Sequence, residues 1–208
     1  MSAFKISNWL PKWLPKWLPQ AVFESTMILF AFLIAFTLEG WKDDRKIERL
    51  IAYAIHNFEN EIKQNNLRIK NVMVFHKGVQ QVLQNQNSNG TFDSIAKFRN
   101  VMDAMKPIVL SNSAWETAVA TGALAQMDFE LVSALTLTYN MQTRFDENYR
   151  ATVRTLLAPN SLAEQNLELT LYATTYFVTE VTTQEAELAI FYNQMLIMLR
   201  PRLSLMGT

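Results

Sequence analysis

Two polar residues, Asn65 and His76, occupy positions in a repeating apolar pattern where side chains are expected to be buried. A histidine can carry a proton or bind a metal, whereas a buried amide more often fixes the register of neighbouring helices. His56 is the other histidine of the chain and forms no H-x-x-x-H pair with His76, so a two-histidine metal site on one helix is not supported. We therefore expect structural roles for Asn65 and His76, with contact to a partner protein as the alternative.

Other chemistries lack their sequence motifs. The chain has no cysteine, which excludes disulfides, thiolate zinc sites, iron–sulfur clusters and cysteine nucleophiles. Its five glycines are scattered, and no phosphate-binding or hydrolase motif is present. The 208 residues carry 19 basic and 19 acidic side chains, and this zero net charge argues against a nucleic-acid-binding protein. We predict no metal site, no cofactor, no nucleic-acid partner and no enzymatic activity.

Carboxylates near the C-terminus are the remaining candidates for metal or catalytic chemistry. No lysine or arginine lies between Arg154 and Arg200. The same region contains Glu164, Glu168, Glu180, Glu185 and Glu187. Because they alternate with apolar residues, they are typical of the solvated face of a long helix. The first long helix predicted for this chain carries basic side chains. We expect these opposite charges to select which antiparallel helices pair, although exposed pairs contribute at most about 1 kcal/mol each.

The repeating apolar pattern itself predicts one long helix. Its residues recur at alternating spacings of four and three, which is a heptad pattern typical of near-parallel helix packing. The positions are Ile51, Ile55, Phe58, Ile62, Asn65, Ile69, Val72, His76, Val79 and Leu83. No proline lies between Gln20 and Lys106, so we expect this helix to continue from the preceding segment and to end at the turn-forming residues 85–90.

The rest of the chain predicts further helices. We expect them over about 92–105, 113–122, 129–157 and 161–199. Ser113–Glu116 and Ser161–Glu164 match the capping box that begins helices, and Gly122 suits the left-handed position that follows a helix end. Pro201 is expected to end the last helix. Residues 172–183 have strand-like composition, but their helical flanks favour helix. The expected fold class is all-α, with long helices in an antiparallel bundle.

The apolar stretch from Ala21 to Leu38 predicts a transmembrane helix. As a helix it would be roughly 27 Å long, close to the thickness of the bilayer hydrocarbon core. Trp17 precedes it and Trp41 follows it, at the headgroup positions that tryptophan prefers. The alternatives are a buried core helix and a cleavable signal peptide, although no small-residue cleavage site follows the stretch. We expect Glu24 at the interface, with contact to a membrane partner as the alternative.

A tandem repeat, WLPKWLPKWLPQ, precedes this stretch at residues 9–20. A proline at every fourth position prevents a continuous α-helix. We expect Trp9, Trp13 and Trp17 to lie in the headgroup layer of the lipid bilayer, with Lys12 and Lys16 directed towards anionic lipid. A disordered tail is the alternative.

These features divide the chain into an interfacial segment (1–20), a transmembrane helix (21–41) and a helical domain (42–208). Lysine and arginine counts on the two sides of the span give no clear orientation, but the short segment before it favours a cytoplasmic N-terminus. We expect a single-pass protein of the bacterial inner membrane with its helical domain in the periplasm.

Three segments resemble the motifs of a domain-of-unknown-function family of small bacterial single-pass membrane proteins. Residues 33–46 read LIAFTLEGWKDDRK, where that family has a span ending in a pattern like IALQINNWNENRK. Residues 61–67 resemble its E-I-x-x-N segment, and residues 114–122 resemble its A-W-E-x-x-x-x-x-G segment. The resemblance covers most of 26–150, but this chain has Glu39 and Gly40 where the family favours two asparagines, and it also carries the tryptophan repeat.

The resemblance implies a membrane-anchored helical domain without a known activity, so it transfers no site residue. Trp115 and Glu116 are expected to begin a helix docked on the core, with partner binding as the alternative. We predict a membrane-anchored interaction or accessory protein that docks on another membrane protein or on itself. The alternative is an extracytoplasmic small-ligand sensor that signals through a partner. The candidate partner contacts are Glu24, Asn65, His76, Trp115 and Glu116.

Overall fold

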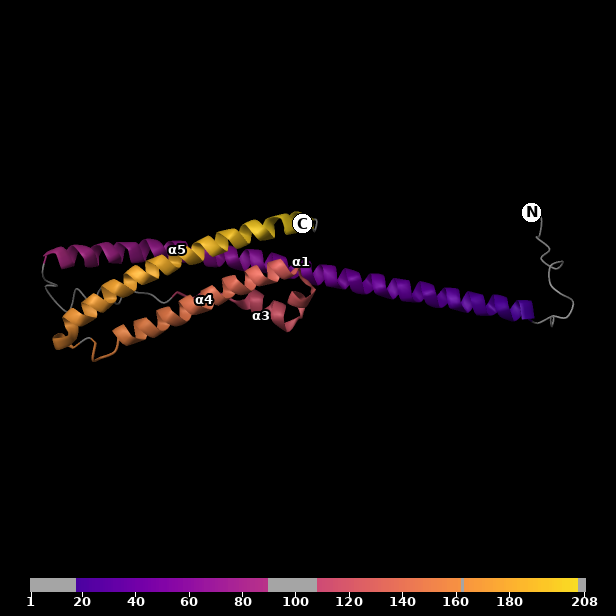
Figure 1. Ribbon diagram of the computed structural model, residues 1–208, viewed down its shortest axis with the longest axis horizontal. Coiled ribbons are helices and arrows are strands. Elements are labelled where there is room, and N and C mark those ends of the chain that lie inside the picture. Colours follow the sequence, from indigo (N-terminus) through magenta and orange to yellow (C-terminus); the bar gives the residue numbers. More distant parts are fainter. Residues whose placement is uncertain (1–17, 90–107, 162, 206–208) are drawn as a thin grey trace. The chain divides into compact units, whose positions relative to one another are not determined.

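The computed structural model describes residues 18–89, 108–161 and 163–205, and all its regular elements are helical. They are the α-helices α1 (Leu18–Asn89), α3 (Ser113–Ala120), α4 (Phe129–Leu156) and α5 (Leu167–Leu205), with the short 3₁₀ segments η2 (Ala123–Gln126) and η3 (Glu164–Asn166) (Figure 1). The all-α prediction is confirmed for the described part of the chain. The predicted helix at 92–105 and the repeat residues up to Trp17 lie outside it.

The chain divides into two units, residues 1–48 and 49–208. In the first unit, the side chains of 22–48 are exposed. This part of α1 is long and apolar enough to cross a membrane, with a mean hydropathy of 1.8 over an 18-residue window of which none is buried. The alternative of a buried core helix does not fit that exposure, because a core helix is covered by its neighbours.

In the second unit, the heptad positions of α1 form the buried face that the sequence predicts. Seven of the ten positions, including Phe58, Ile62 and Ile69, are at most 1% exposed, and Ile51 and Val72 pack half-buried against them. One hydrophobic cluster joins these side chains to buried residues of α4 and α5. Each fully buried aliphatic or aromatic side chain contributes about 1.5–3 kcal/mol, so this face dominates the stability of the unit.

The helix α3 does not begin with the predicted capping box. Its N-cap is Asn112, which makes no capping bond through its side chain. The Ser113 hydroxyl donates instead to Glu61 (2.7 Å), and Glu116 accepts a hydrogen bond from the Asn112 amide (3.0 Å). A distant carboxylate therefore takes the hydroxyl that the local pattern assigns to the helix end. Gly122 does adopt the expected left-handed conformation, with φ of 71°.

The bounds of α5 also differ from the prediction. The helix begins at Leu167 rather than Ser161, whose hydroxyl donates to the Thr155 carbonyl (2.9 Å) in the preceding helix. Pro201 lies inside α5, which continues to Leu205. Only about one turn follows this proline, so its missing amide donor interrupts the helix close to its end. The Arg202 guanidinium donates to the Met198 carbonyl in this last part of the helix (2.9 Å).

The threonine-rich middle of α5 is helical, and its hydroxyls bond within the helix. Thr174, Thr175 and Thr179 each donate to the carbonyl four residues earlier, at 2.7–2.9 Å. Such bonds satisfy the hydroxyl without a partner from another element, so β-branched residues are accommodated in the helix. The prediction of helix over residues 172–183 is confirmed.

Candidate functional site

Polar side chains inside the second unit gather in two clusters on the buried face of α1. The Glu61 cluster contains Glu61, Asn65, Ser111, Ser113, Tyr139, Gln142 and Tyr192, and the His76 cluster contains His76, Tyr149 and Glu185. Both clusters take side chains from α1, α4 and α5, so each one ties the three long helices together.

The Glu61 carboxylate accepts four hydrogen bonds. Its Oε2 accepts from the hydroxyls of Ser111 (2.6 Å) and Ser113 (2.7 Å) and from the Ala114 amide (3.0 Å). Its Oε1 accepts from the Tyr139 hydroxyl (2.7 Å). Burial alone would raise the pKa of Glu61, but these bonds together hold its pKa below the usual range. Glu61 is therefore an anion at neutral pH that holds the start of α3 against α1 and α4.

Asn65 continues this cluster with a second set of bonds. Its amide nitrogen donates to the Ser111 carbonyl (2.7 Å) and to Gln142 Oε1 (3.1 Å), and its oxygen accepts from the Ser111 amide (3.0 Å). Gln142 Oε1 also accepts from the Tyr192 hydroxyl (2.6 Å). Burial raises the pKa of both Tyr139 and Tyr192, so the two phenols remain neutral donors. The cluster is thus a satisfied network that fixes helix register.

Trp115 and Glu116 lie at the edge of the Glu61 cluster. The Trp115 ring is half-buried and stacks on Tyr139, with ring centroids 5.4 Å apart. Glu116 is exposed at the start of α3. In the first unit, Glu24 is exposed, and the Arg45 guanidinium lies 4.1 Å from the centroid of the exposed Trp41 ring. Of the predicted partner contacts, Asn65, His76 and Trp115 therefore belong to the second unit, as does Glu116. Glu24 belongs to the first unit.

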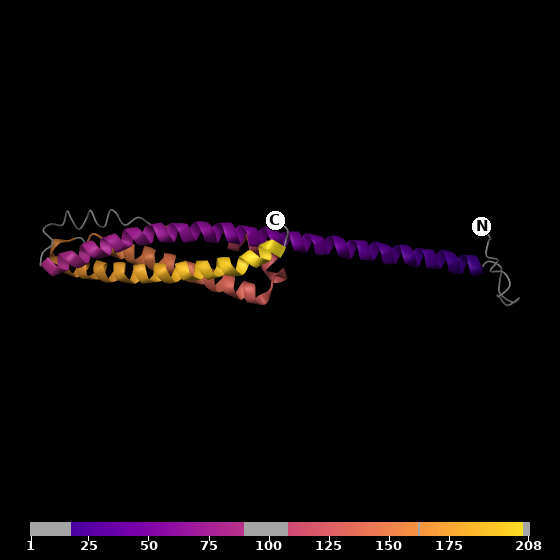
Figure 2. The ribbon, with the colours of Figure 1, turned by 90° about the horizontal axis from the view of Figure 1, so that it is seen from above.

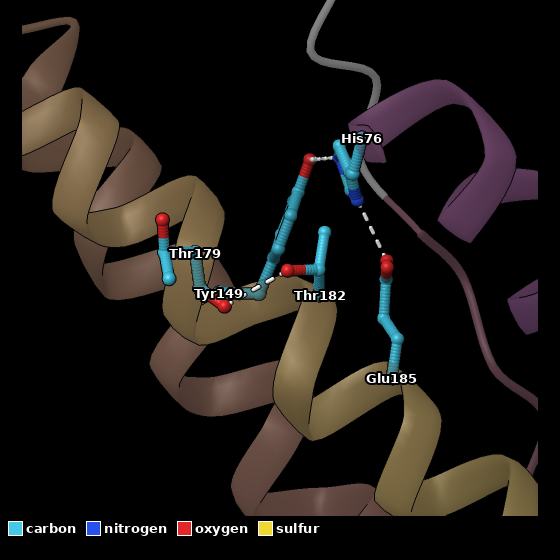
Figure 3. A network of polar contacts seen from close by, with 5 residues as sticks. All are labelled: His76, Tyr149, Thr179, Thr182 and Glu185. Atoms are coloured by element: carbon cyan, nitrogen blue, oxygen red, sulfur yellow. Dashed lines mark hydrogen bonds and ion pairs between the residues drawn. The ribbon is translucent and has the colours of Figure 1, made fainter. Parts of the chain in front are cut away.

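The His76 cluster joins an imidazole, a phenol and a carboxyl group inside the helical unit (Figure 3). His76 Nδ1 lies 2.7 Å from Glu185 Oε1, and both side chains are 0% exposed. The Tyr149 hydroxyl lies on the other side of the imidazole, 3.5 Å from Nε2. The rings of Phe75 and Phe177 pack against His76 and Tyr149, respectively. This arrangement can hold a proton between helices, at a place where the His76 and Glu185 side chains are closed off from solvent.

Glu185 is poorly solvated. Burial raises its pKa, against the hydrogen bond and charge of His76 and the charge of Lys77, which lower it. Its Oε2 is buried without a hydrogen-bond partner. Burial and the Glu185 charge also raise the pKa of Tyr149 to about 12. An ionised Glu185 accepts from the imidazole N–H, whereas a protonated Glu185 donates to Nδ1, so the contact persists in both states.

The expectation that Glu185 belongs to a solvated acidic face is wrong. Glu180 and Glu187 are exposed, but Glu185 shares the spacing of the buried residues Val181 and Leu188. The spacing of these apolar neighbours in the sequence contained this signal. Among the described ion pairs, the basic side chains of α1 do not pair with exposed glutamates of α5: Lys63 binds Glu59 of its own helix, and the α1–α5 pair is the buried one. A partly exposed pair between helices joins Arg202 of α5 to Asp128 at the start of α4 (3.5 Å).

Sequence reasoning assigned no role to the Glu61 carboxylate. Its donors Ser111, Ser113 and Tyr139 come from positions 50 to 78 residues away along the chain. No periodic pattern links such residues. The available signal was the position of Glu61 beside Ile62, on the edge of the buried heptad face.

A groove of two adjoining cavities lies along α4 and α5. These two helices pack side by side (Figure 2). We call this groove the α4–α5 groove. Its larger cavity has a volume of about 710 Å³ and its smaller one about 210 Å³, and both are lined by Asn148, Glu180 and Gln184. Tyr149 lines the larger cavity and also contacts His76, so the groove borders the His76 cluster.

A second depression, of about 450 Å³, lies beside the Glu61 cluster between α1 and α3. It is widely open and lined mainly by polar side chains, including Asn57, Asn60 and Arg68. In the described part of the chain, no group of three or more histidine, aspartate or glutamate side chains is placed to hold a metal ion. The described residues thus offer one groove along α4 and α5, one buried polar cluster at His76, and one polar cluster whose Glu61, Ser111 and Ser113 line an open depression.

Comparison with known proteins finds no match among family models, curated proteins or solved structures. The resemblance of residues 26–150 to a membrane-protein family therefore remains an interpretation of the motifs. Function has to be argued from the geometry of the chain itself.

Proposed function

We propose that this protein is a membrane-anchored helical interaction protein. The single observation that carries the proposal is the make-up of α1, which bears an exposed apolar segment at 22–38 and a buried heptad face further along the same helix. In this proposal the first segment spans the bacterial inner membrane, and α1, α4 and α5 form an antiparallel bundle on its periplasmic side that docks on a partner protein.

The polar groups within the apolar segment support a membrane location. The Thr26 hydroxyl donates to the Val22 carbonyl (2.7 Å), and the Thr37 hydroxyl donates to the Ile34 carbonyl (2.8 Å). Hydroxyls satisfied inside the helix need no water, as hydrocarbon surroundings require. Leucine, isoleucine and phenylalanine at the centre of such a helix each favour insertion by about 0.3–0.6 kcal/mol. At its end, the contact of Arg45 with Trp41 suits the headgroup layer.

The buried polar clusters support an interaction role over a catalytic one. His76 and Glu185 are fully buried inside the helical unit, and Glu61 is 9% exposed at the edge of an open depression. Their hydrogen bonds join helices to one another, which gives the unit a rigid surface to present. We therefore include in the proposal that the protein is not an enzyme and binds no cofactor.

The absence of cysteine makes the proposal directly testable. Single-cysteine variants at exposed positions, Ser204→Cys near the end of α5 and Gln64→Cys on α1, should react in intact spheroplasts with a membrane-impermeant maleimide. The full chain should also resist alkaline extraction from membranes, and crosslinking in native membranes should capture a defined partner. Release by alkali, or labelling only after membrane disruption, would refute the anchor or the topology.

A further inference from the structure

We propose that the α4–α5 groove docks an amphipathic helix of a partner protein, with basic side chains on the edge of that helix that faces α5. This inference rests on the proposed interaction function and assigns its binding surface. The argument uses the shape of the groove, its exposed apolar residues and its charges.

The groove is elongated along the two helices. Its two cavities share three lining residues, and together they follow α5 from Leu169 to Leu188. That stretch corresponds to roughly 28 Å of helix axis. A small ligand is usually enclosed in a compact pocket, whereas a long open groove between two helices is the shape that receives a third helix.

The outward face of α5 carries large apolar side chains that nothing in the described structure covers. Their exposed fractions are 70% for Leu169, 71% for Tyr172, 63% for Tyr176, 55% for Ile190 and 71% for Ile197. Leu169, Tyr172 and Tyr176 line the groove at spacings of three and four residues. Ile190 and Ile197 lie on the same side of the helix beyond the groove, and the polar residues Thr179, Thr183 and Glu187 separate the two groups. A solvated helix face normally carries polar residues, so the apolar group formed by Leu169, Tyr172 and Tyr176 indicates a surface that is covered in the working protein.

The charges along the groove favour a basic partner. Glu180 and Glu187 lie on its α5 side, and Arg144 lies on its α4 side. A helix in the groove would therefore match best with lysine or arginine towards α5 and an acid opposite Arg144. A second copy of this chain fits less well, because a copy that laid its own α5 along the groove would bring Glu180 and Glu187 towards side chains of like charge.

The test uses the full chain in lipid nanodiscs and a synthetic three-heptad helical peptide with an apolar stripe, lysines on one edge and glutamates on the other. A second peptide of identical composition exchanges the two edges. We expect fluorescence anisotropy to show that one of the two peptides binds the chain at least fivefold more tightly than the other. The double variant Glu180→Lys/Glu187→Lys should reverse that preference, and Tyr176→Ala should weaken both peptides tenfold. These residues are exposed, so the variants should fold, which circular dichroism verifies.

Matched controls are available outside the groove. Tyr53→Ala removes a tyrosine that is as exposed as Tyr172 but lies on α1, and Glu147→Lys reverses an exposed charge of α4 outside the groove lining. Both should leave peptide affinity unchanged.

Equal affinity for the two peptides, or a preference that survives the charge reversal, would overturn the proposal. A dimer that dissociates on Tyr176→Ala would also overturn it, because the surface would then belong to a second copy. Resistance to alkaline extraction, together with partner capture through residues outside the groove, would show that the interaction function holds even if the groove assignment fails.

Discussion

Replacing Glu61 with glutamine tests whether the buried anion holds the start of α3 in place. Glutamine keeps the shape of the side chain but has one acceptor oxygen and one NH₂ donor. The carboxylate accepts three bonds at Oε2 and one at Oε1. With the amide oxygen at the Oε2 position, the three donors there keep an acceptor, and the Tyr139 hydroxyl meets an NH₂ group and has to turn to accept from it.

The expected destabilisation follows from the change in bond strength. Hydrogen bonds to a charged group contribute about 1.5–3 kcal/mol, and neutral ones about 0.5–1.5 kcal/mol. Four bonds that each weaken by about 1 kcal/mol give roughly 4 kcal/mol, from which the smaller desolvation cost of a neutral amide is subtracted. We expect Glu61→Gln to lower the free energy of unfolding of the helical unit by about 2–3 kcal/mol.

The pH dependence gives this prediction a second readout. Because the folded-state pKa of Glu61 is lowered, its stabilising contribution is fully present above the unfolded-state pKa and is lost as the pH falls through the folded-state pKa. The wild type should therefore lose stability below about pH 4, and the variant should lack this part of the acid response.

Hydrogen–deuterium exchange around Ala114, whose amide donates directly to Glu61, measures the local effect in the full chain in detergent. Chemical denaturation followed by tyrosine fluorescence measures the effect on the whole unit. The exposed Glu147→Gln is the matched control. An equal loss in the two variants, or an unchanged acid profile for Glu61→Gln, would refute the reasoning.

Three further substitutions have defined outcomes. Glu185→Gln should stabilise the unit by about 1 kcal/mol at neutral pH. The folded-state pKa of Glu185 is raised, so its contribution to stability is fully present below its unfolded-state pKa and is lost as the pH rises through the folded-state pKa. A destabilised variant in a denaturation series from pH 5 to 8 would contradict this sign. Gly122→Ala should cost about 1 kcal/mol in a thermal melt, since the left-handed φ of 71° strains a residue with a Cβ although no neighbour lies within 4 Å; an unchanged melting temperature would show that the turn relaxes. Ile62→Ala should cost about 2–5 kcal/mol by leaving a cavity in the core, whereas Leu67→Ala on the exposed side of the same helix should cost less than about 1 kcal/mol; similar losses for the two would contradict the heptad assignment.

The sequence predicts the buried face of α1 well because one period governs all its positions. Ile55, Ile62 and Ile69 follow each other at seven-residue intervals, and each is buried. The same period also placed Asn65 and His76 correctly, since a position on a helix face does not depend on which atoms bind there. Helix existence and the buried side are local properties and can be read from spacing.

The partners of the polar residues could not be predicted in this way. Ser113 lies in a capping pattern, yet its hydroxyl binds a carboxylate of α1 that is 52 residues away in sequence. The bond between His76 and Glu185 spans 109 residues. Such contacts depend on the rotation and axial offset of whole helices, which a single sequence does not encode in any short pattern.

The internal bonding of the threonines in α5 changes the chemical character of its surface. Thr183 lies in the lining of the smaller cavity of the α4–α5 groove, and its hydroxyl donates to the Thr179 carbonyl (3.1 Å). Because its hydroxyl proton is occupied within the helix, Thr183 has no free donor to offer to a molecule in the groove. By composition α5 is rich in hydroxyl groups, but at this position a bound molecule meets a side chain that donates as little as valine does. A hydrophobicity scale that treats each threonine hydroxyl as free to bond with water would underestimate the apolar character of this helix.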